Sequence, residues 1–247
     1  MSLSPTFYSC HTFTPLLPSS ASAFFSRSQL RRPQIATTTV PVVMDVAQTS
    51  ISASLGDKNA QVTLGDMYRD GKGVPQDYQA AMDWYFKAVE QGDAAGQQRV
   101  GGLYEQGFGV CRKYSTAMFW YRSAAEQGYA VAQHSIGVLY SHGRGVPQDC
   151  TRAMEWYLKA ADQGHAESQY NIGGLYYFGQ GVRQDYTQAM NWFLKAAIQG
   201  HDFAKNGIGL LYKYGQGVPQ DFVQAMGWFV EAAKQENDVA QFNIGML

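Results

Sequence analysis

The chain has 247 residues, of which 45% are apolar and 16% are charged, and its 19 basic side chains nearly balance 20 acidic ones. The net charge of −1 argues against nucleic-acid binding, because a basic stripe is needed to neutralise the phosphates. No apolar run reaches the roughly 18 residues that a transmembrane helix requires, so the sequence predicts no membrane span.

Residues 1–44 lack Asp and Glu, contain Arg27, Arg31 and Arg32, and are rich in Ser, Thr and Pro. This composition is typical of a plastid or mitochondrial transit peptide. It fits a disordered tail equally well, because such residues bury too little apolar surface to offset the entropy lost on ordering. We therefore expect residues 1–55 to be a disordered or targeting segment. A cytoplasmic location is favoured, and an organellar one is the alternative.

The three cysteines, Cys10, Cys111 and Cys150, are odd in number and unevenly spaced. This pattern predicts neither a disulfide framework nor a zinc site, and it favours a reducing compartment. Cys150 stands where other units carry an aromatic residue, and we expect it to be a small core residue.

A period of 36 residues organises the rest of the chain. Its clearest marker is the set of five tryptophans, at Trp84, Trp120, Trp156, Trp192 and Trp228. A fixed period of this length predicts stacked repeats that bury their apolar faces against one another. The periodic region is 56–247, with units at 56–91, 92–127, 128–163, 164–199 and 200–235 and a partial unit at 236–247.

The first unit shows how each repeat is expected to fold. Ala60, Leu64 and Tyr68 recur at helical spacing, and Gly71 ends this first helix. A turn with glycines and a proline follows, and Asp77 is placed to cap a second helix that has its own apolar face. The predicted fold class is therefore all-α, a solenoid of helix-turn-helix repeats of 36 residues.

Three columns of the repeat carry specific expectations. Gly65 and its copies interrupt the first helix of each unit, which predicts a neighbouring backbone too close for a methyl group. The tryptophan column is predicted to lie in the core. Lys113 in the second unit stands where the others have Asp, and lysine cannot accept hydrogen bonds from helix N–H groups. We therefore expect this turn to be the loosest.

The fourth unit contains the segments AESQYNIGGLY (166–176), GQGVRQDY (179–186) and AMNWFLKAA (189–197). These segments closely resemble the Sel-one-like repeat, a relative of the tetratricopeptide repeat, and the resemblance extends over residues 56–247. It implies a right-handed α-α superhelix that serves as an adaptor or scaffold in protein complexes. Some family members join each helix pair by a disulfide, and this chain lacks a cysteine pair in each unit, so it resembles the disulfide-free branch.

The partial unit at 236–247 reproduces only the first helix of a repeat. Its Phe242, Met246 and Leu247 offer apolar surface. Either this open helix contacts another molecule, or the array continues in a longer chain. The sequence leaves both alternatives open.

No catalytic constellation follows from the sequence. His134 and His142 are the best candidate pair, but on one helix they lie about 12 Å apart, too far to share a metal ion. His165 and His201 follow a glycine between units and are expected to be solvated. We predict no catalytic site, metal or cofactor, and a non-catalytic scaffold that binds a protein or peptide. The alternative is a structural spacer or regulatory arm within a larger signalling protein.

Variation between repeats locates the predicted binding surface. The columns of Asn59 and Asp70 change freely from unit to unit, and the family resemblance implies that they line a concave groove. The early part of this groove is polar, and its later part gathers six larger residues: Tyr170, Tyr177, Phe178, Phe203, Leu210 and Tyr214. Exposed aromatics from adjacent units are typical of binding hot spots, so these residues are the candidate site for an extended peptide or partner helix. The alternative is that several of them fill gaps against neighbouring helices.

Overall fold

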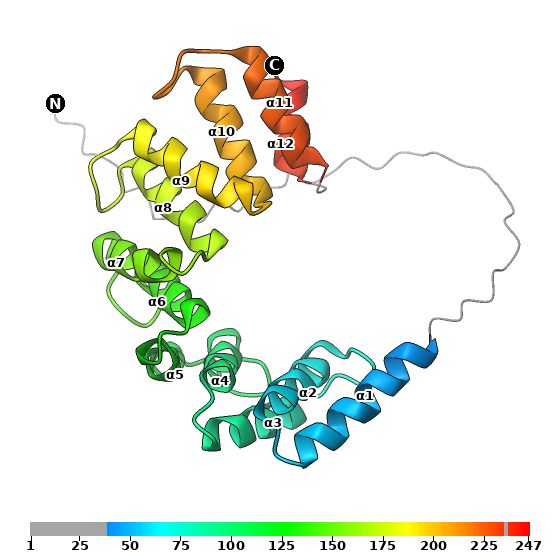
Figure 1. Ribbon diagram of the computed structural model, residues 1–247. Helices are drawn as coiled ribbons and strands as arrows, with labels where there is room; N and C mark the ends of the chain where they lie inside the picture. The colour runs from blue at the N-terminus through cyan, green and yellow to red at the C-terminus, as the bar shows by residue number, and fades with distance from the viewer. Residues whose placement is uncertain (1–38, 235–236) are drawn as a thin grey trace, which may run out of the picture. The chain divides into compact units, whose positions relative to one another are not determined.

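The computed structural model describes residues 39–234 and 237–247, and within these ranges the chain is helical throughout, with no strand (Figure 1). None of the helices in these ranges combines the length and apolarity that crossing a membrane requires. The helices are α1 (Thr39–Ser54), α2 (Lys58–Asp70), α3 (Tyr78–Glu90), α4 (Ala94–Gln106), α5 (Tyr114–Glu126), α6 (Ala130–His142), α7 (Cys150–Ala161), α8 (Ala166–Phe178), α9 (Tyr186–Ile198), α10 (Asp202–Tyr214), α11 (Phe222–Ala233) and α12 (Asp238–Gly245).

The described helices fall into two compact units, with the boundary between Gly96 and Gln97 in α4. The first holds α1 to α3 and the start of α4, and the second holds the rest of α4 and α5 to α12. Helices that follow one another in a repeat pack as pairs, which are α2 with α3, α6 with α7, α8 with α9 and α10 with α11. This pairing confirms the predicted all-α fold of helix-turn-helix repeats.

Helix α1 packs against α2 in the manner of a second helix from a preceding repeat. The Gln61 side-chain amide donates a hydrogen bond to the Ala53 carbonyl of α1 at 3.1 Å. Gln133, two repeats later, donates in the same way to the Ala125 carbonyl of α5. Helix α1 therefore covers the apolar face of α2 as α5 covers that of α6.

This helix corrects the predicted boundary at residue 55. The predicted segment 1–55 is not without structure at its end, because α1 spans Thr39–Ser54 and packs on α2. The rest of the predicted disordered or targeting segment, residues 1–38, lies outside the described residues.

The turns inside the repeats follow the predicted capping pattern, and the second repeat departs from it as expected. The Asp185 carboxylate accepts a hydrogen bond from the Gln188 N–H at 3.0 Å and so caps α9. Lys113 makes no side-chain capping bond to α5. Its neighbour Arg112 donates to the Gln106 carbonyl at 3.2 Å, so the turn loses its cap but stays linked to the first helix.

The core of each repeat is an aromatic ring of the second helix packed on a glycine of the first. A methyl group at Gly173 would lie 2.5 Å from Cδ1 of Phe193, a residue that is 2% exposed. Gly137 and Tyr157 have the same relationship. The glycine column therefore marks a helix contact, but the close neighbour is an aromatic ring and not the predicted backbone.

The tryptophans lie beside the core and not within it. Trp192 is half-buried, and the Lys195 ammonium lies 3.8 Å from the centre of its ring. Trp156 and Lys159 form the same pair at 3.9 Å. The prediction that this column lies in the core is wrong, because a helix turns about 100° per residue and the next aromatic residue takes the inward direction.

Cys150 also departs from its prediction. Its side chain is half-buried and not in the core. Cys111 is exposed and free.

Glutamine pairs join the two helices of a repeat. The Gln199 side-chain amide donates to Oε1 of Gln169 at 2.8 Å, and Gln169 is buried. Three more pairs at 2.8 to 2.9 Å have the same separation of 30 residues, and they are Gln91 with Gln61, Gln127 with Gln97 and Gln163 with Gln133. Each pair satisfies a buried amide oxygen that would otherwise lack a donor.

Candidate functional site

The six residues of the predicted binding surface lie on α8 and α10, and they differ in how far their side chains are exposed to solvent. Tyr170 is 8% exposed, whereas Phe178 and Tyr214 are 46% and 57% exposed. The other three are half-buried, and they are Tyr177, Phe203 and Leu210.

Tyr170 belongs to the core where two repeats meet. Its ring stacks on that of His201 with 4.6 Å between the ring centres, and it lies 5.8 Å from the ring of Phe193. Burial raises the pKa of its hydroxyl. Tyr170 is therefore corrected from an exposed contact to a supporting core residue, because the start of the next repeat covers its face of α8.

Phe178 and Tyr214 are the last residues of α8 and α10, and they occupy the same column one repeat apart. The Tyr177 ring meets Phe178 edge-on at 4.9 Å and Tyr186 at 5.4 Å. Burial raises the pKa of Tyr177 to about 12, with smaller contributions from the hydroxyls of Tyr186 and Tyr214. We call Tyr177, Phe178, Leu210 and Tyr214 the aromatic surface.

The face of α8 next to Phe178 is open. Gly174 lies one helical turn before Phe178, and a methyl group at Gly174 would meet no atom within 4 Å. Leu210 takes the same column of α10, one turn before Tyr214. A bound chain could therefore approach the backbone of α8 more closely than that of α10.

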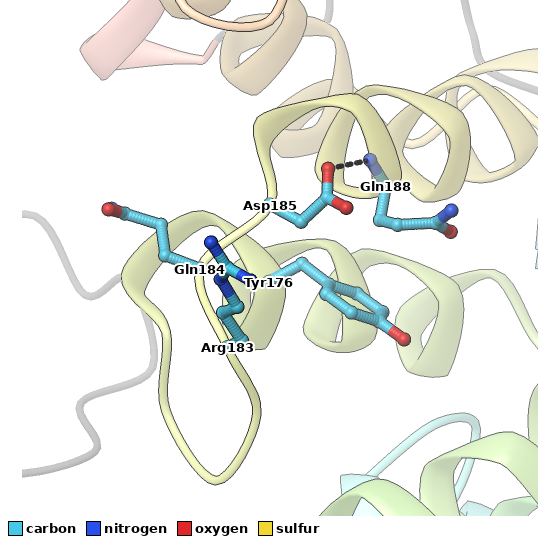
Figure 2. A pocket seen from close by; sticks show the side chains of 5 residues that line it. All are labelled: Tyr176, Arg183, Gln184, Asp185 and Gln188. Atoms are coloured by element: carbon cyan, nitrogen blue, oxygen red, sulfur yellow. Dashed lines mark hydrogen bonds between the residues drawn. The ribbon is translucent and has the colours of Figure 1, made fainter.

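A cavity of about 550 Å³ lies at the turn between α8 and α9, lined by Tyr176, Arg183, Gln184, Asp185 and Gln188 (Figure 2). Figure 2 shows the capping bond from the Gln188 N–H to Asp185. Gln184 donates to the Tyr177 carbonyl at 2.8 Å and to the Tyr186 hydroxyl at 2.9 Å. These polar groups hold the turn that supports the aromatic surface.

Three histidines from successive repeats form a second cluster, which sequence reasoning missed. The rings of His134 and His165 lie 4.8 Å apart, and Ser168 Oγ lies 3.0 Å from Nδ1 of each. Nε2 of His201 lies 2.9 Å from the Glu167 carboxylate. We call these five residues the histidine cluster. The expectation that His201 is solvated is wrong, because its ring stacks on Tyr170 of the preceding repeat and its side chain is 10% exposed. His165 is half-buried.

Burial sets the electrostatics of the histidine cluster. It lowers the pKa of His134 to about 4, and the neighbouring His165 lowers it further. Burial also lowers the pKa of His165. The hydrogen bond from His201 lowers the pKa of Glu167. The cluster therefore favours neutral His134 and His165 beside one carboxylate.

The histidine cluster is not a metal centre by its geometry. Among the described residues, no group of three or more His, Cys, Asp and Glu side chains could hold a metal ion. The sequence did contain an indication of the cluster. The residue directly before the first helix of each repeat is His165, His201 or Asn237 in three successive repeats.

The architecture and the repeat sequence together match one protein family. The family model of the Sel1 repeat matches residues 58–93, 94–129, 130–165, 166–201 and 203–237. The chain belongs to the Sel1 repeat family. This family forms helical solenoids that are generally protein-interaction scaffolds. A comparison with curated protein sequences gave no match.

Solved structures of other Sel1 repeat proteins agree with this assignment. A protective antigen present in uropathogenic Escherichia coli strains is 36% identical with a TM-score of 0.71, over 83% of this chain and 44% of that chain. The chain thus spans less than half of that protein. A Sel1 repeat protein from Oxalobacter formigenes is 29% identical with a TM-score of 0.71, over 85% and 87% of the two chains. An immunity protein from Pseudomonas aeruginosa, 18% identical with a TM-score of 0.56 over 82% and 83%, shares the fold.

The Sel1 repeats differ from one another beside the aromatic surface. The core Tyr121 donates its hydroxyl to Glu105 at 2.7 Å, and Tyr157 donates to Ser141 at 3.2 Å. The next repeat carries Phe193 in this position, and Tyr177 replaces the polar partner. Phenylalanine has no hydroxyl and needs no acceptor. The column of Glu105 and Ser141 can therefore carry the aromatic Tyr177 in this repeat.

Helix α12 and the residues after it, in the partial unit at 236–247, expose apolar side chains that the sequence predicted. Phe242 is 67% exposed and Met246 is 60% exposed. The Lys213 ammonium donates to the Met246 carbonyl at 3.2 Å and ties α12 to α10. A contact with a partner through this helix stays a prediction.

Proposed function

We propose that the chain is a non-catalytic scaffold that binds a protein, through an extended peptide or a partner helix laid on the aromatic surface. The observation that carries the proposal is the exposure of Phe178 and Tyr214 in the same column of adjacent repeats. Large aromatic side chains supply much of the binding free energy at protein interfaces, where they are held rigidly and lose little entropy.

The surroundings of the aromatic surface favour a macromolecular ligand over a small one. Tyr177 packs between Phe178 and Tyr186 and fixes the end of α8. Gly174 leaves the adjacent backbone open. A surface that continues from one repeat to the next suits a ligand that is itself extended, such as a peptide segment or a helix.

The buried members of the predicted site have a supporting role in this proposal. Tyr170 stacks on His201, and Phe203 lies 6.2 Å from Tyr170 between ring centres. These contacts join the starts of α8 and α10. They set the relative position of the two helices that carry the exposed aromatics.

The test replaces only the exposed residues, so that the core is left intact. Phe178→Glu with Tyr214→Glu places two charges on the aromatic surface. Ile198→Glu is the matched control. Ile198 is an apolar residue at the end of α9 that is 85% exposed and does not belong to the aromatic surface. Circular dichroism checks that both variants fold.

Binding is measured by capture from the native extract and by a photo-crosslinking amino acid placed at position 174, where a side chain meets no atom within 4 Å of its Cβ. We expect one discrete protein to crosslink at this position, to be lost with the double variant and to be retained with the Ile198 variant. Equal capture by the folded double variant would rule out the aromatic surface. Absence of any discrete crosslinked protein would instead favour the structural spacer.

A further inference from the structure

The histidine cluster links consecutive repeats through a chain of hydrogen bonds. His134 lies in α6, and Ser168 lies in the first turn of α8, 34 residues further along the chain. His165 is the N-cap residue of α8, and its Nδ1 accepts the Ser168 N–H at 3.2 Å. The link therefore passes from one repeat, through a serine hydroxyl, to the residue that caps the next.

One set of proton positions makes every contact of this chain a hydrogen bond. A backbone N–H can only donate, so Nδ1 of His165 must carry a lone pair. The Ser168 hydroxyl, at 3.0 Å from the same nitrogen, can then donate to it and accept from Nδ1–H of His134 at 3.0 Å. Both imidazoles are neutral in this arrangement, with the proton on Nδ1 of His134 and on Nε2 of His165.

In other repeats the residue in the capping position of His165 differs in whether it can still accept a hydrogen bond at low pH. Asp57 accepts the Ala60 N–H at 2.8 Å through a carboxylate, and Asn237 accepts the Ala240 N–H at 2.9 Å through an amide oxygen. Tyr129 makes no side-chain capping bond to α6. A carboxylate or an amide stays an acceptor at pH 5, whereas a protonated imidazole has no lone pair left.

We propose that His134, Ser168 and His165 form an acid-responsive joint between the third and fourth repeats. A proton taken from solvent by Nδ1 of His165 removes the acceptor of the Ser168 N–H and the acceptor of the Ser168 hydroxyl. The cap of α8 and its link to α6 are lost together. The first turn of α8 then opens while the rest of the helix stays packed.

The charges around His165 decide how the joint takes up protons. His134 faces it from α6, Glu167 lies in the first turn of α8, and His201 approaches from the start of α10, where Nε2 bonds Glu167. Two more titratable side chains lie near these groups: the Tyr157 ring is 5.5 Å from the ring of His134, and the Asp202 carboxylate acts on Tyr170. Glu167 attracts a proton to His134 and to His165, and a proton on one of these two imidazoles opposes a proton on the other, so uptake is stepwise. His165 is less buried than His134, so burial opposes its protonation less.

The joint lies beside residues that support the aromatic surface. Tyr170 follows Ser168 by two residues in α8 and stacks on His201. Opening of the first turn would loosen this stack. An effect of acid on partner capture therefore rests on the proposed function, whereas the opening of the joint does not.

The test measures amide hydrogen exchange by NMR at pH 7 and pH 5, corrected for the intrinsic exchange rates. We expect the protection of the Ser168 amide in the intact chain to fall about fivefold, the change that follows from loss of one helix cap. The Ala132 amide is the internal reference, because it bonds the backbone of the uncapped Tyr129. Its protection should stay constant.

The matched variant is His165→Asn, which copies the cap that Asn237 provides in the same column. We expect its Ser168 amide to keep the same protection at both pH values. Unchanged protection in the intact chain would overturn the joint, and so would an equal fall in His165→Asn. An equal fall at Ala132 would show global unfolding in place of a local opening and would also overturn it.

Discussion

The ring of Phe193 lies directly against the backbone of Gly173, so that a methyl group on this glycine would come within 2.5 Å of the ring. The same aromatic residue is almost completely buried. A ring that is closed in on every side cannot move away without disturbing its own packing. The helix pair therefore depends on the absence of a single side chain.

Gly173→Ala should destabilise the protein, and the adjacent Gly174→Ala should not. The first change overpacks the core and should lower the free energy of unfolding by about 1 to 3 kcal/mol. The second adds a methyl group in open space and should raise it by up to about 1 kcal/mol, because alanine favours the helix. Urea unfolding of both variants measures the difference. Equal midpoints would refute the packing role of Gly173.

Lys113→Asp should strengthen the second repeat. The lysine makes no capping bond to α5, whereas Asp77 accepts two N–H groups at the start of α3. An aspartate at this position should raise the free energy of unfolding by about 1 kcal/mol. Asp185→Ala, which removes an existing cap, should lower it by a similar amount. Thermal melting of the two variants should show shifts of opposite sign.

The buried His134 should make stability fall in acid. Its pKa is about 4 in the folded chain and about 6.5 when unfolded. Between these values the unfolded chain binds a proton that the folded chain does not, so the free energy of unfolding decreases as the pH falls. From pH 7 to pH 5 the expected loss from this group is about 2 kcal/mol.

His134→Gln tests this assignment, because glutamine fills the same column in the second repeat at Gln98. The variant should lose less stability than the parent chain over this pH range, as measured by urea unfolding at each pH. Parallel pH dependence in both proteins would show that other groups are responsible.

Gln199→Ala should lower the free energy of unfolding, although Gln199 is an exposed residue in a turn. Its side chain supplies the donor for the buried Oε1 of Gln169, and an unsatisfied buried acceptor costs about 1 to 3 kcal/mol. Gln188→Ala is a suitable control, because this side chain is exposed on α9. The two variants should be compared by thermal unfolding, and similar melting temperatures would contradict the role of the glutamine pair.

Much of the fold was predictable because it depends on a repeated local pattern. The 36-residue period, the helix pairs, the capping aspartates and the missing cap at Lys113 follow from residues close together in sequence. The sequence did not predict which of two adjacent aromatic residues would point into the core. Trp192 and Phe193 are both large and aromatic, and only the helix direction decides that Phe193 enters the core.

The candidate site was predictable only in part, because exposure depends on what the next repeat covers. Phe178 and Tyr214 are exposed, as the variation between repeats predicted, but Tyr170 is covered by His201 from the following repeat. His134 and His165 lie 31 residues apart, so spacing along one helix could not bring them together. Comparison of the residues before each first helix points to His165 and His201 as caps, but not to their contact with His134.

The glutamine pairs give the array a practical advantage during synthesis. Each pair joins residues only 30 positions apart, so its partners are both outside the ribosome soon after one repeat has emerged. A growing chain can then close its repeats one after another, with no distant segment to wait for. Such local closure favours rapid folding and shortens the time for which apolar helix faces stay open to aggregation.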